Sequence, residues 1–156
     1  ETLQGVGYTN YEFSNFGKDG YMSRNNTAYW TGKPYLGIGP SAHSYNGTQR
    51  SWNINNNPKY IKSLQNGELP NEVETLSTTD KYNEYVMTGL RTIWGVSLRK
   101  VETDFGKNFK NYLLEHSANF IKDHLLFLDG DRLLVTSKGK FLSDGIASEL
   151  FMVNLK

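Results

Sequence analysis

The sequence has no cysteine, no long apolar run and no strong excess of charge of either sign. Without cysteine, the chain cannot form a disulfide or ligate an iron–sulfur cluster through thiolates. No apolar run approaches the ~18 residues needed to cross a bilayer, so we expect no membrane span. Lys and Arg number 17 against 16 Asp and Glu. This balance argues against a partner that is a polyanion, and we expect no nucleic acid.

Apolar residues make up only 37% of the 156 residues, but aromatic residues reach 13%. Because each ring buries a large area, a modest core is possible. The length fits one domain, or one domain plus part of another. Residues 1–7 lack the pattern of a secretory signal, so we expect a cytoplasmic protein. The chain begins at Glu1 rather than methionine, and we expect it to be a piece of a longer protein.

The two halves of the sequence differ in composition. Residues 1–78 hold nine of the 15 glycines and show almost no helical periodicity after residue 7. Residues 79–156 repeat apolar residues with the period of a helix. The change near Thr78 predicts a domain boundary, with a linker over residues 66–76.

In the first half, alternation predicts a strand over residues 8–15. A short buried strand over residues 35–39 should enter a glycine-rich turn. Pro58 near a first turn and Gly67 at the end predict a helix over residues 58–66.

The second half has clearer start and stop signals. Ser77 and Asp80 fit a capping box that begins a helix ending near Gly95. Ser97 should cap a second helix that stops at Gly106. A third helix, a hairpin and a fourth helix are expected over residues 107–123, 125–135 and 137 onward. The fold class is therefore α+β, and the second half is a winged-helix-like helical domain with a β-hairpin.

Asn25, Asn26, Tyr29 and Trp30 form the first candidate site. Flat aromatic surface with a few fixed polar groups suits a planar apolar ligand. The alternative, which the residue types alone favour, is that the rings pack a loop onto a core while the asparagines make turns.

Gly37, Gly39 and His43 form the second candidate site. Glycines after a strand let the backbone approach a ligand, and free amides there can bind an anion. The alternative is a tight turn at the end of a strand. His43 fits a proton carrier, a ligand or a packed loop histidine. The three separated histidines predict no metal site, and the carboxylate pairs at 102/104 and 129/131 are interpreted as solvated surface rather than catalytic groups.

Three motifs occur in order at Tyr11–Phe16, Ser23–Trp30 and Tyr35–Ser44, and stretches at 89–96 and 133–143 follow them. Together they resemble the oxygen-independent coproporphyrinogen III oxidase family of the radical S-adenosylmethionine class, over nearly the whole chain. The resemblance is greatest to its haem-chaperone-like branch. That branch often has His-Asn-x-x-Tyr-Trp, a motif associated with haem binding. Here Asn25 takes the first position, and an amide cannot ligate iron as imidazole does. Ser41 replaces a glycine of the family.

The resemblance implies a full-length parent whose amino-terminal cysteine motif holds a [4Fe-4S] cluster that cleaves S-adenosylmethionine. Residues 1–45 would be the terminal strands of an incomplete radical-SAM (β/α) barrel. Residues 46–78 would connect them to the winged-helix-like domain at 79–156, which would cover the barrel mouth. The chain alone should hold no cofactor, although haem is possible, and it should be catalytically inactive. Tetrapyrrole binding is assigned to Asn25, Asn26, Tyr29 and Trp30, and cofactor binding to Gly37, Gly39 and His43.

Three functional hypotheses follow. The first is a fragment of an oxidase that decarboxylates coproporphyrinogen III, contributing to tetrapyrrole binding or covering the active site. The second is a fragment of a haem chaperone that delivers haem to a client haemoprotein, which the Tyr-Trp and Gly-Pro-Ser-Ala-His context favours. The third is a nucleic-acid-binding winged-helix module. Expected partners are the missing amino-terminal barrel, a tetrapyrrole and, through unpaired strand edges, a second copy of the chain.

Overall fold

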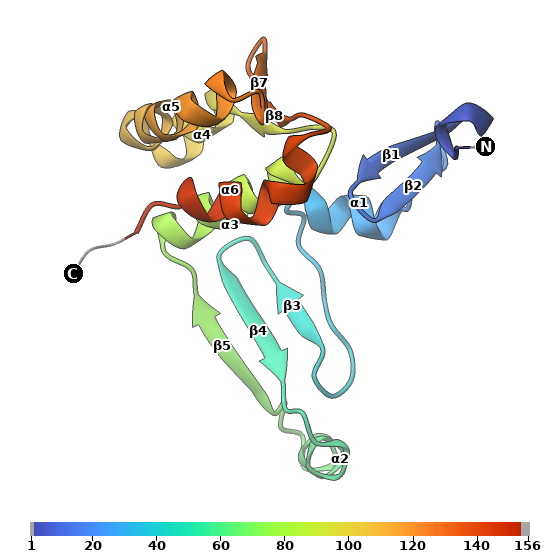
Figure 1. The fold of residues 1–156 in the computed structure, drawn as a ribbon. Helices are drawn as coiled ribbons and strands as arrows, with labels where there is room; N and C mark the ends of the chain where they lie inside the picture. Colours follow the sequence, from blue (N-terminus) through green and yellow to red (C-terminus); the bar gives the residue numbers. More distant parts are fainter. Residues whose placement is uncertain (1, 154–156) are drawn as a thin grey trace.

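The computed structural model describes residues 2–153, which form three groups of elements (Figure 1). A hairpin and the helix α1 lie beside a helical group that contains a small sheet. A second sheet, made of β3, β4 and β5, extends away from the helical group and carries α2 at its far end. The expected α+β class is confirmed. Within residues 2–153 we find no helix with the length and apolar character required to cross a bilayer.

The first group is an antiparallel hairpin followed by a short helix. β1 (Tyr8–Glu12) pairs with β2 (Asn15–Lys18), so the predicted strand over residues 8–15 is wrong in its second part, where the chain reverses. The helix α1 (Arg24–Trp30) was not predicted. It begins at Ser23, whose Oγ accepts a hydrogen bond from the backbone N–H of Asn26 at 3.3 Å. This side-chain cap satisfies one of the free amides of the first turn.

The second group is a three-stranded antiparallel sheet with the order β3-β4-β5. The predicted helix over residues 58–66 is confirmed as α2, but the predicted linker over residues 66–76 is wrong because it contains a strand. The elements are β3 (His43–Tyr45), β4 (Gln49–Asn53), α2 (Asn57–Gln65) and β5 (Asn71–Thr75).

The predicted buried strand over residues 35–39 is wrong. Only Tyr35 pairs, through an isolated bridge to Tyr45. The side chains of Leu36 and Ile38 are 79% and 86% exposed. The apolar residues of this segment are therefore exposed and do not form a buried strand.

The third group follows the predicted order closely. The capping box of Ser77 and Asp80, the cap at Ser97 and the hairpin are confirmed. Two boundaries differ from the prediction: the first helix ends at Leu90 rather than near Gly95, and the last helix begins at Ser143, after a single 3-10 turn. The elements are α3 (Thr78–Leu90), β6 (Val96–Ser97), α4 (Leu98–Phe105), α5 (Lys107–Lys122), β7 (Leu126–Asp129), β8 (Arg132–Val135), η2 (Gly139–Leu142) and α6 (Ser143–Glu149).

The main hydrophobic core lies in this third group. Side chains from α3, α5, the β6-β8-β7 sheet and α6 meet there, and each buried large side chain contributes about 1.5–3 kcal/mol. Its largest members are fully buried: Tyr82, Leu90, Leu113, Leu126, Leu133 and Leu150. The first group contacts this helical group through the bridge between Glu12 and Thr92 and the ion pair between Glu12 and Arg91.

Candidate functional site

The two predicted candidate sites meet at one pocket between α1 and the segment before β3. The pocket has a volume of about 450 Å³. All four residues assigned to tetrapyrrole binding line it, and so do Gly37 and His43, whereas Gly39 does not. We call this space the α1 pocket. Its volume falls in the range of small-molecule sites, ~300–1,000 Å³.

A row of aromatic rings forms one wall of the α1 pocket. The rings of Tyr29 and Trp30 meet edge to face with centroids 5.1 Å apart. Tyr35 continues the row at 5.8 Å from Tyr29, and the row extends beyond the pocket lining to Tyr45, at 6.2 Å from Tyr35. Tyr29 remains 51% exposed. The wall therefore offers apolar ring surface that a flat ligand can cover.

The two asparagines of α1 differ in what they contact. The Asn26 side chain donates from Nδ2 to Asn15 Oδ1 at 2.8 Å, so it ties α1 to the hairpin. The Asn25 side chain makes no hydrogen bond to any residue in the range 2–153. Asn25 is thus available to a ligand, whereas the amide of Asn26 already supports the pocket wall.

The two glycines have internal structural roles. A Cβ at Gly37 would lie 2.1 Å from the carbonyl oxygen of His43, so only glycine allows this close approach. The N–H of Gly37 donates to Ser44 Oγ at 2.9 Å, and the N–H of Gly39 donates to Tyr60 Oη at 3.3 Å. The sequence predicts that these backbone amides are free to bind an anion. Both amides are instead engaged within the chain.

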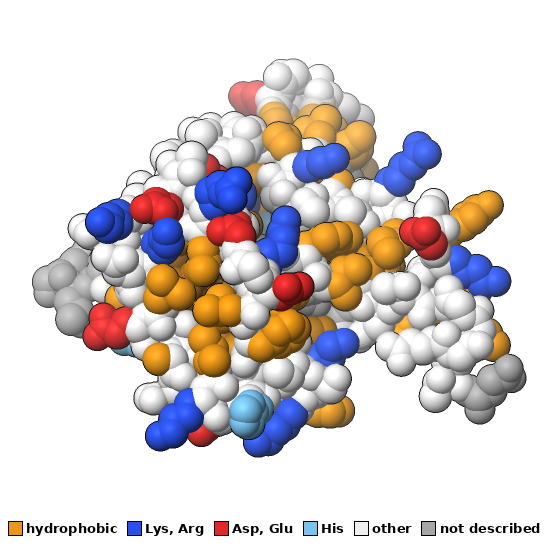
Figure 2. Space-filling view, turned by 90° about the horizontal axis from the view of Figure 1, so that it is seen from above, with side chains coloured by type: hydrophobic (Ala, Val, Ile, Leu, Met, Phe, Trp, Pro, Cys, Tyr) orange, Lys and Arg blue, Asp and Glu red, His pale blue; other side chains and the backbone are white. Residues whose placement is uncertain are grey.

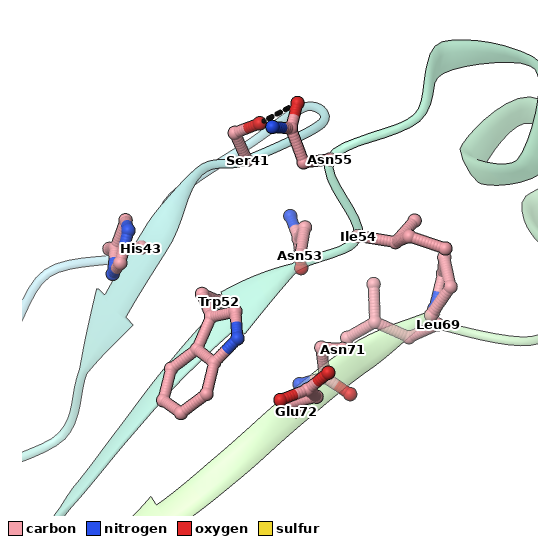
Figure 3. Close-up of a pocket in the computed structure, with 10 residues that line it drawn as sticks. Ser41, His43, Trp52, Asn53, Ile54, Asn55, Leu69, Asn71 and Glu72 are labelled. Atoms are coloured by element: carbon pink, nitrogen blue, oxygen red, sulfur yellow. Dashed lines mark hydrogen bonds between the residues drawn. The ribbon is translucent and has the colours of Figure 1, made fainter.

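His43 lines the α1 pocket and also a second pocket of about 590 Å³, which Figure 3 shows beside β4 and β5. Its imidazole is exposed, its ring centroid is 6.3 Å from that of Trp52, and it makes no hydrogen bond to another described side chain. Ser41 in the second pocket has φ 60 and bonds Asn55 Oδ1 through its hydroxyl at 2.7 Å. That left-handed backbone explains the glycine found here in the family that the sequence resembles.

A buried carboxylate behind the α1 pocket was not identified from the sequence. Glu12 is 1% exposed and accepts hydrogen bonds from the backbone and hydroxyl of Ser14, from Asn15 Nδ2 and from Arg91 Nη2 at 3.2 Å. Burial raises the pKa of this carboxyl, but the four donors outweigh it and hold the pKa below its ordinary value. Since Asn15 also bonds Asn26, the Glu12 cluster reaches the pocket wall.

Arg91 connects this cluster to both neighbouring groups of elements. Its guanidinium carbon lies 5.2 Å from the centre of the Phe13 ring and 5.4 Å from that of Trp30. Its Nη1 also pairs with Asp144 of α6 at 3.0 Å. Because Arg91 follows the last turn of α3, the helical group holds the Trp30 ring in place. The contact joins residues that are 61 positions apart, so no local sequence pattern could have predicted the support that Arg91 gives to Trp30.

The remaining polar clusters are structural. Lys110 Nζ pairs with Glu102 at 2.6 Å, and Lys100 pairs with Asp104. Asp131 accepts from Ser97 Oγ at 2.6 Å and fixes the start of α4. Within residues 2–153, no group of three or more His, Cys, Asp or Glu side chains could hold a metal ion. These groups give no constellation for acid–base or metal-assisted catalysis.

The described residues thus combine an α+β fold with a pocket that aromatic side chains and His43 line. Residues 76–142 match the family described as the HemN C-terminal domain. The chain belongs to the oxygen-independent coproporphyrinogen III oxidase family and corresponds to its carboxy-terminal part.

Relatives named "Heme chaperone HemW" occur in Lactococcus lactis and Mycobacterium tuberculosis. They are 33% identical over 146 residues and 32% over 149 residues, covering 94% and 95% of this chain. The chain spans only 38% and 36% of their lengths. The fold also matches a solved structure of the Escherichia coli coproporphyrinogen III oxidase HemN, described as a radical SAM enzyme. The TM-score is 0.71 at 21% identity, over 96% of this chain and 38% of that one.

Proposed function

We propose that this chain supplies a tetrapyrrole-binding wall to a protein of porphyrin or haem metabolism. The observation that carries the proposal is the convergence of Asn25, Tyr29, Trp30 and His43 on the α1 pocket. A macrocycle lying flat against Tyr29 and Trp30 would bury the exposed ring surface, and Asn25 would donate to a polar edge of the ligand.

Two roles within the family fit this wall. Delivery of haem to a client haemoprotein is supported by the relatives named haem chaperones at more than 30% identity. Decarboxylation of coproporphyrinogen III by the full-length parent, with this chain binding the substrate or covering the active site, is supported by the likeness to HemN. That likeness concerns the fold. We favour haem delivery, because the imidazole of His43 can ligate haem iron, and the decarboxylation of coproporphyrinogen III does not require such a ligand.

The whole protein is proposed to contain a further, amino-terminal part. Residues 1–45 would then complete a radical-SAM barrel that carries the [4Fe-4S] cluster and S-adenosylmethionine. The residues present do not fit the cluster, because they include no cysteine. An exposed apolar surface on the β3-β4-β5 sheet and the preceding segment supports a covering partner. It consists of Leu36, Ile38, Leu69 and Val73.

The domain boundaries at 45 and 78, the winged-helix relationship of residues 79–156 and a cytoplasmic location remain predictions. The order of α3, β6, α4, α5 and the β7-β8 hairpin supports the winged-helix assignment. A nucleic-acid partner has no comparable support. Lys and Arg are interspersed with Asp and Glu around apolar side chains on the face seen in Figure 2. A homodimer would pair through the open edge of β5. The like charges of Glu72 and Glu74 on that edge would oppose this pairing.

The test is a titration of the chain with haemin, followed through the Soret band. We expect saturable binding. Trp30→Ala should weaken it about tenfold, since an aromatic contact contributes about 0.5–1.5 kcal/mol beyond its buried area and ~1.4 kcal/mol is a factor of ten. Tyr21→Ala is the matched control, because Tyr21 is 85% exposed and does not line the α1 pocket. Equal affinities of the parent chain and Trp30→Ala would eliminate the proposed wall.

A further inference from the structure

We infer that His43 is the axial ligand of a haem iron bound in the α1 pocket, which rests on the tetrapyrrole site proposed above. Asn25 also lines the α1 pocket, but its amide is a poor iron ligand. The assignment of the ligand therefore depends on which donor atoms the rest of the pocket offers.

Haem iron in proteins is held by imidazole, thiolate, thioether or phenolate. The chain has no thiolate, and none of its three methionines lines the α1 pocket. A phenol must lose its proton to ligate well, and burial raises the pKa of the Tyr35 phenol above its ordinary value. Tyr29 packs against the rings on both sides of it. The imidazole of His43 is the strongest donor on the pocket wall.

The backbone fixes His43 while leaving its imidazole free. His43 is the first residue of β3 and pairs with Trp52 of β4. Its carbonyl oxygen occupies the space that a side chain at Gly37 would need. The ring has no hydrogen bond to any described side chain that a ligand would have to break. His43 is exposed, and it lines the pocket that Trp30 also lines. A rigid backbone with an unengaged imidazole favours ligation, because little order is lost when the bond to iron forms.

The other two histidines lie elsewhere. His116 on α5 stacks on Tyr112 with ring centroids 3.9 Å apart, and His124 follows the end of α5 with φ 57. Neither lines the α1 pocket. They are matched controls, since each removes one imidazole from the same chain without touching the proposed site.

The experiment compares haemin with iron-free protoporphyrin IX on the parent chain and on His43→Ala, His116→Ala and His124→Ala. For His43→Ala we expect haemin affinity to fall at least tenfold, the Soret maximum to shift, and added imidazole to restore the parent spectrum. Protoporphyrin affinity should stay within about twofold, since that ligand has no iron to ligate. The two control variants should match the parent chain with both ligands.

The outcomes separate the two proposals. A His43→Ala spectrum and haemin affinity equal to those of the parent chain would overturn the ligand assignment alone. Failure of the parent chain to bind either porphyrin would overturn the tetrapyrrole site together with the ligand.

Discussion

Arg91 should contribute more to stability than a surface arginine because, among residues 2–153, its guanidinium is the only cationic partner of the buried Glu12 carboxylate. Arg91→Met keeps an apolar stem of similar length but removes the charge, the hydrogen bond and the ring contacts. We expect it to lower the free energy of unfolding by about 3 kcal/mol, from terms that can be estimated one by one.

A hydrogen bond to a charged group contributes about 1.5–3 kcal/mol. The contacts with the Phe13 and Trp30 rings add about 0.5–1 kcal/mol each at partly exposed positions. The pair with Asp144 adds little, because Asp144 is 76% exposed. The loss should stay below the ~3–5 kcal/mol extreme for an unpaired buried charge, because Ser14 and Asn15 still donate to Glu12.

Urea unfolding followed by circular dichroism measures the effect, with Arg99→Met as the control. Arg99 is exposed on α4, and its replacement should change the unfolding free energy by less than about 0.5 kcal/mol. A double-mutant cycle with Glu12→Gln isolates the pair, and we expect a coupling of about 2 kcal/mol. Coupling below about 0.5 kcal/mol would refute the reasoning that the pair acts as a buried ion pair.

The same carboxylate predicts a dependence on pH. The pKa of Glu12 in the folded chain lies below its ordinary value of 4.5. A group of this kind stabilises the fold above its unfolded pKa, and that stabilisation is lost as the pH falls through the folded pKa. The parent chain should therefore lose its advantage over Glu12→Gln as the solution is acidified below about pH 4.5. An advantage that is unchanged down to pH 2 would contradict the lowered pKa.

Three further substitutions test the local geometry. Gly37→Ala should destabilise the chain by at least about 2 kcal/mol, because the new Cβ would clash with the His43 carbonyl. Gly145→Ala lies in open space on α6 and should raise stability by about 0.5–1 kcal/mol. Thermal unfolding measures both variants. Ser77→Ala removes the cap that pairs with Asp80 and should cost about 1 kcal/mol in urea unfolding; no measurable change would mean that the capping box is not formed.

The second half of the chain could be predicted because its signals are local. The Ser77 cap, the Ser97 cap and the turn at Gly130 each determine a boundary within a few residues of themselves. The error at the last helix has the same origin. Thr136 accepts a hydrogen bond from the N–H of Gly139 and begins a 3-10 turn, which delays the helix to Ser143.

The first half was harder because its structure depends on distant contacts. α1 is only seven residues long, carries no buried side chain and shows no helical periodicity in the sequence. β5 has a single apolar residue, Val73, between two glutamates and is almost wholly exposed, so its sequence resembles that of a linker. In the segment over residues 35–39, the apolar Leu36 and Ile38 face outward, and a pattern that assumes burial cannot find this.

The candidate site illustrates the same difference in physical terms. Residue types identified its aromatic and imidazole members, because a flat ligand requires rings whatever the fold. They could not separate Asn25 from its neighbour Asn26, since only the contact with Asn15 shows that one amide is already engaged. They also could not reveal that the wall rests on Arg91. Because Arg91 contacts the Trp30 ring and the Glu12 cluster together, any movement of α3 relative to the hairpin must disturb the surface proposed to bind the macrocycle. Loss of Arg91 should therefore weaken porphyrin binding as well as stability, although Arg91 does not line the pocket.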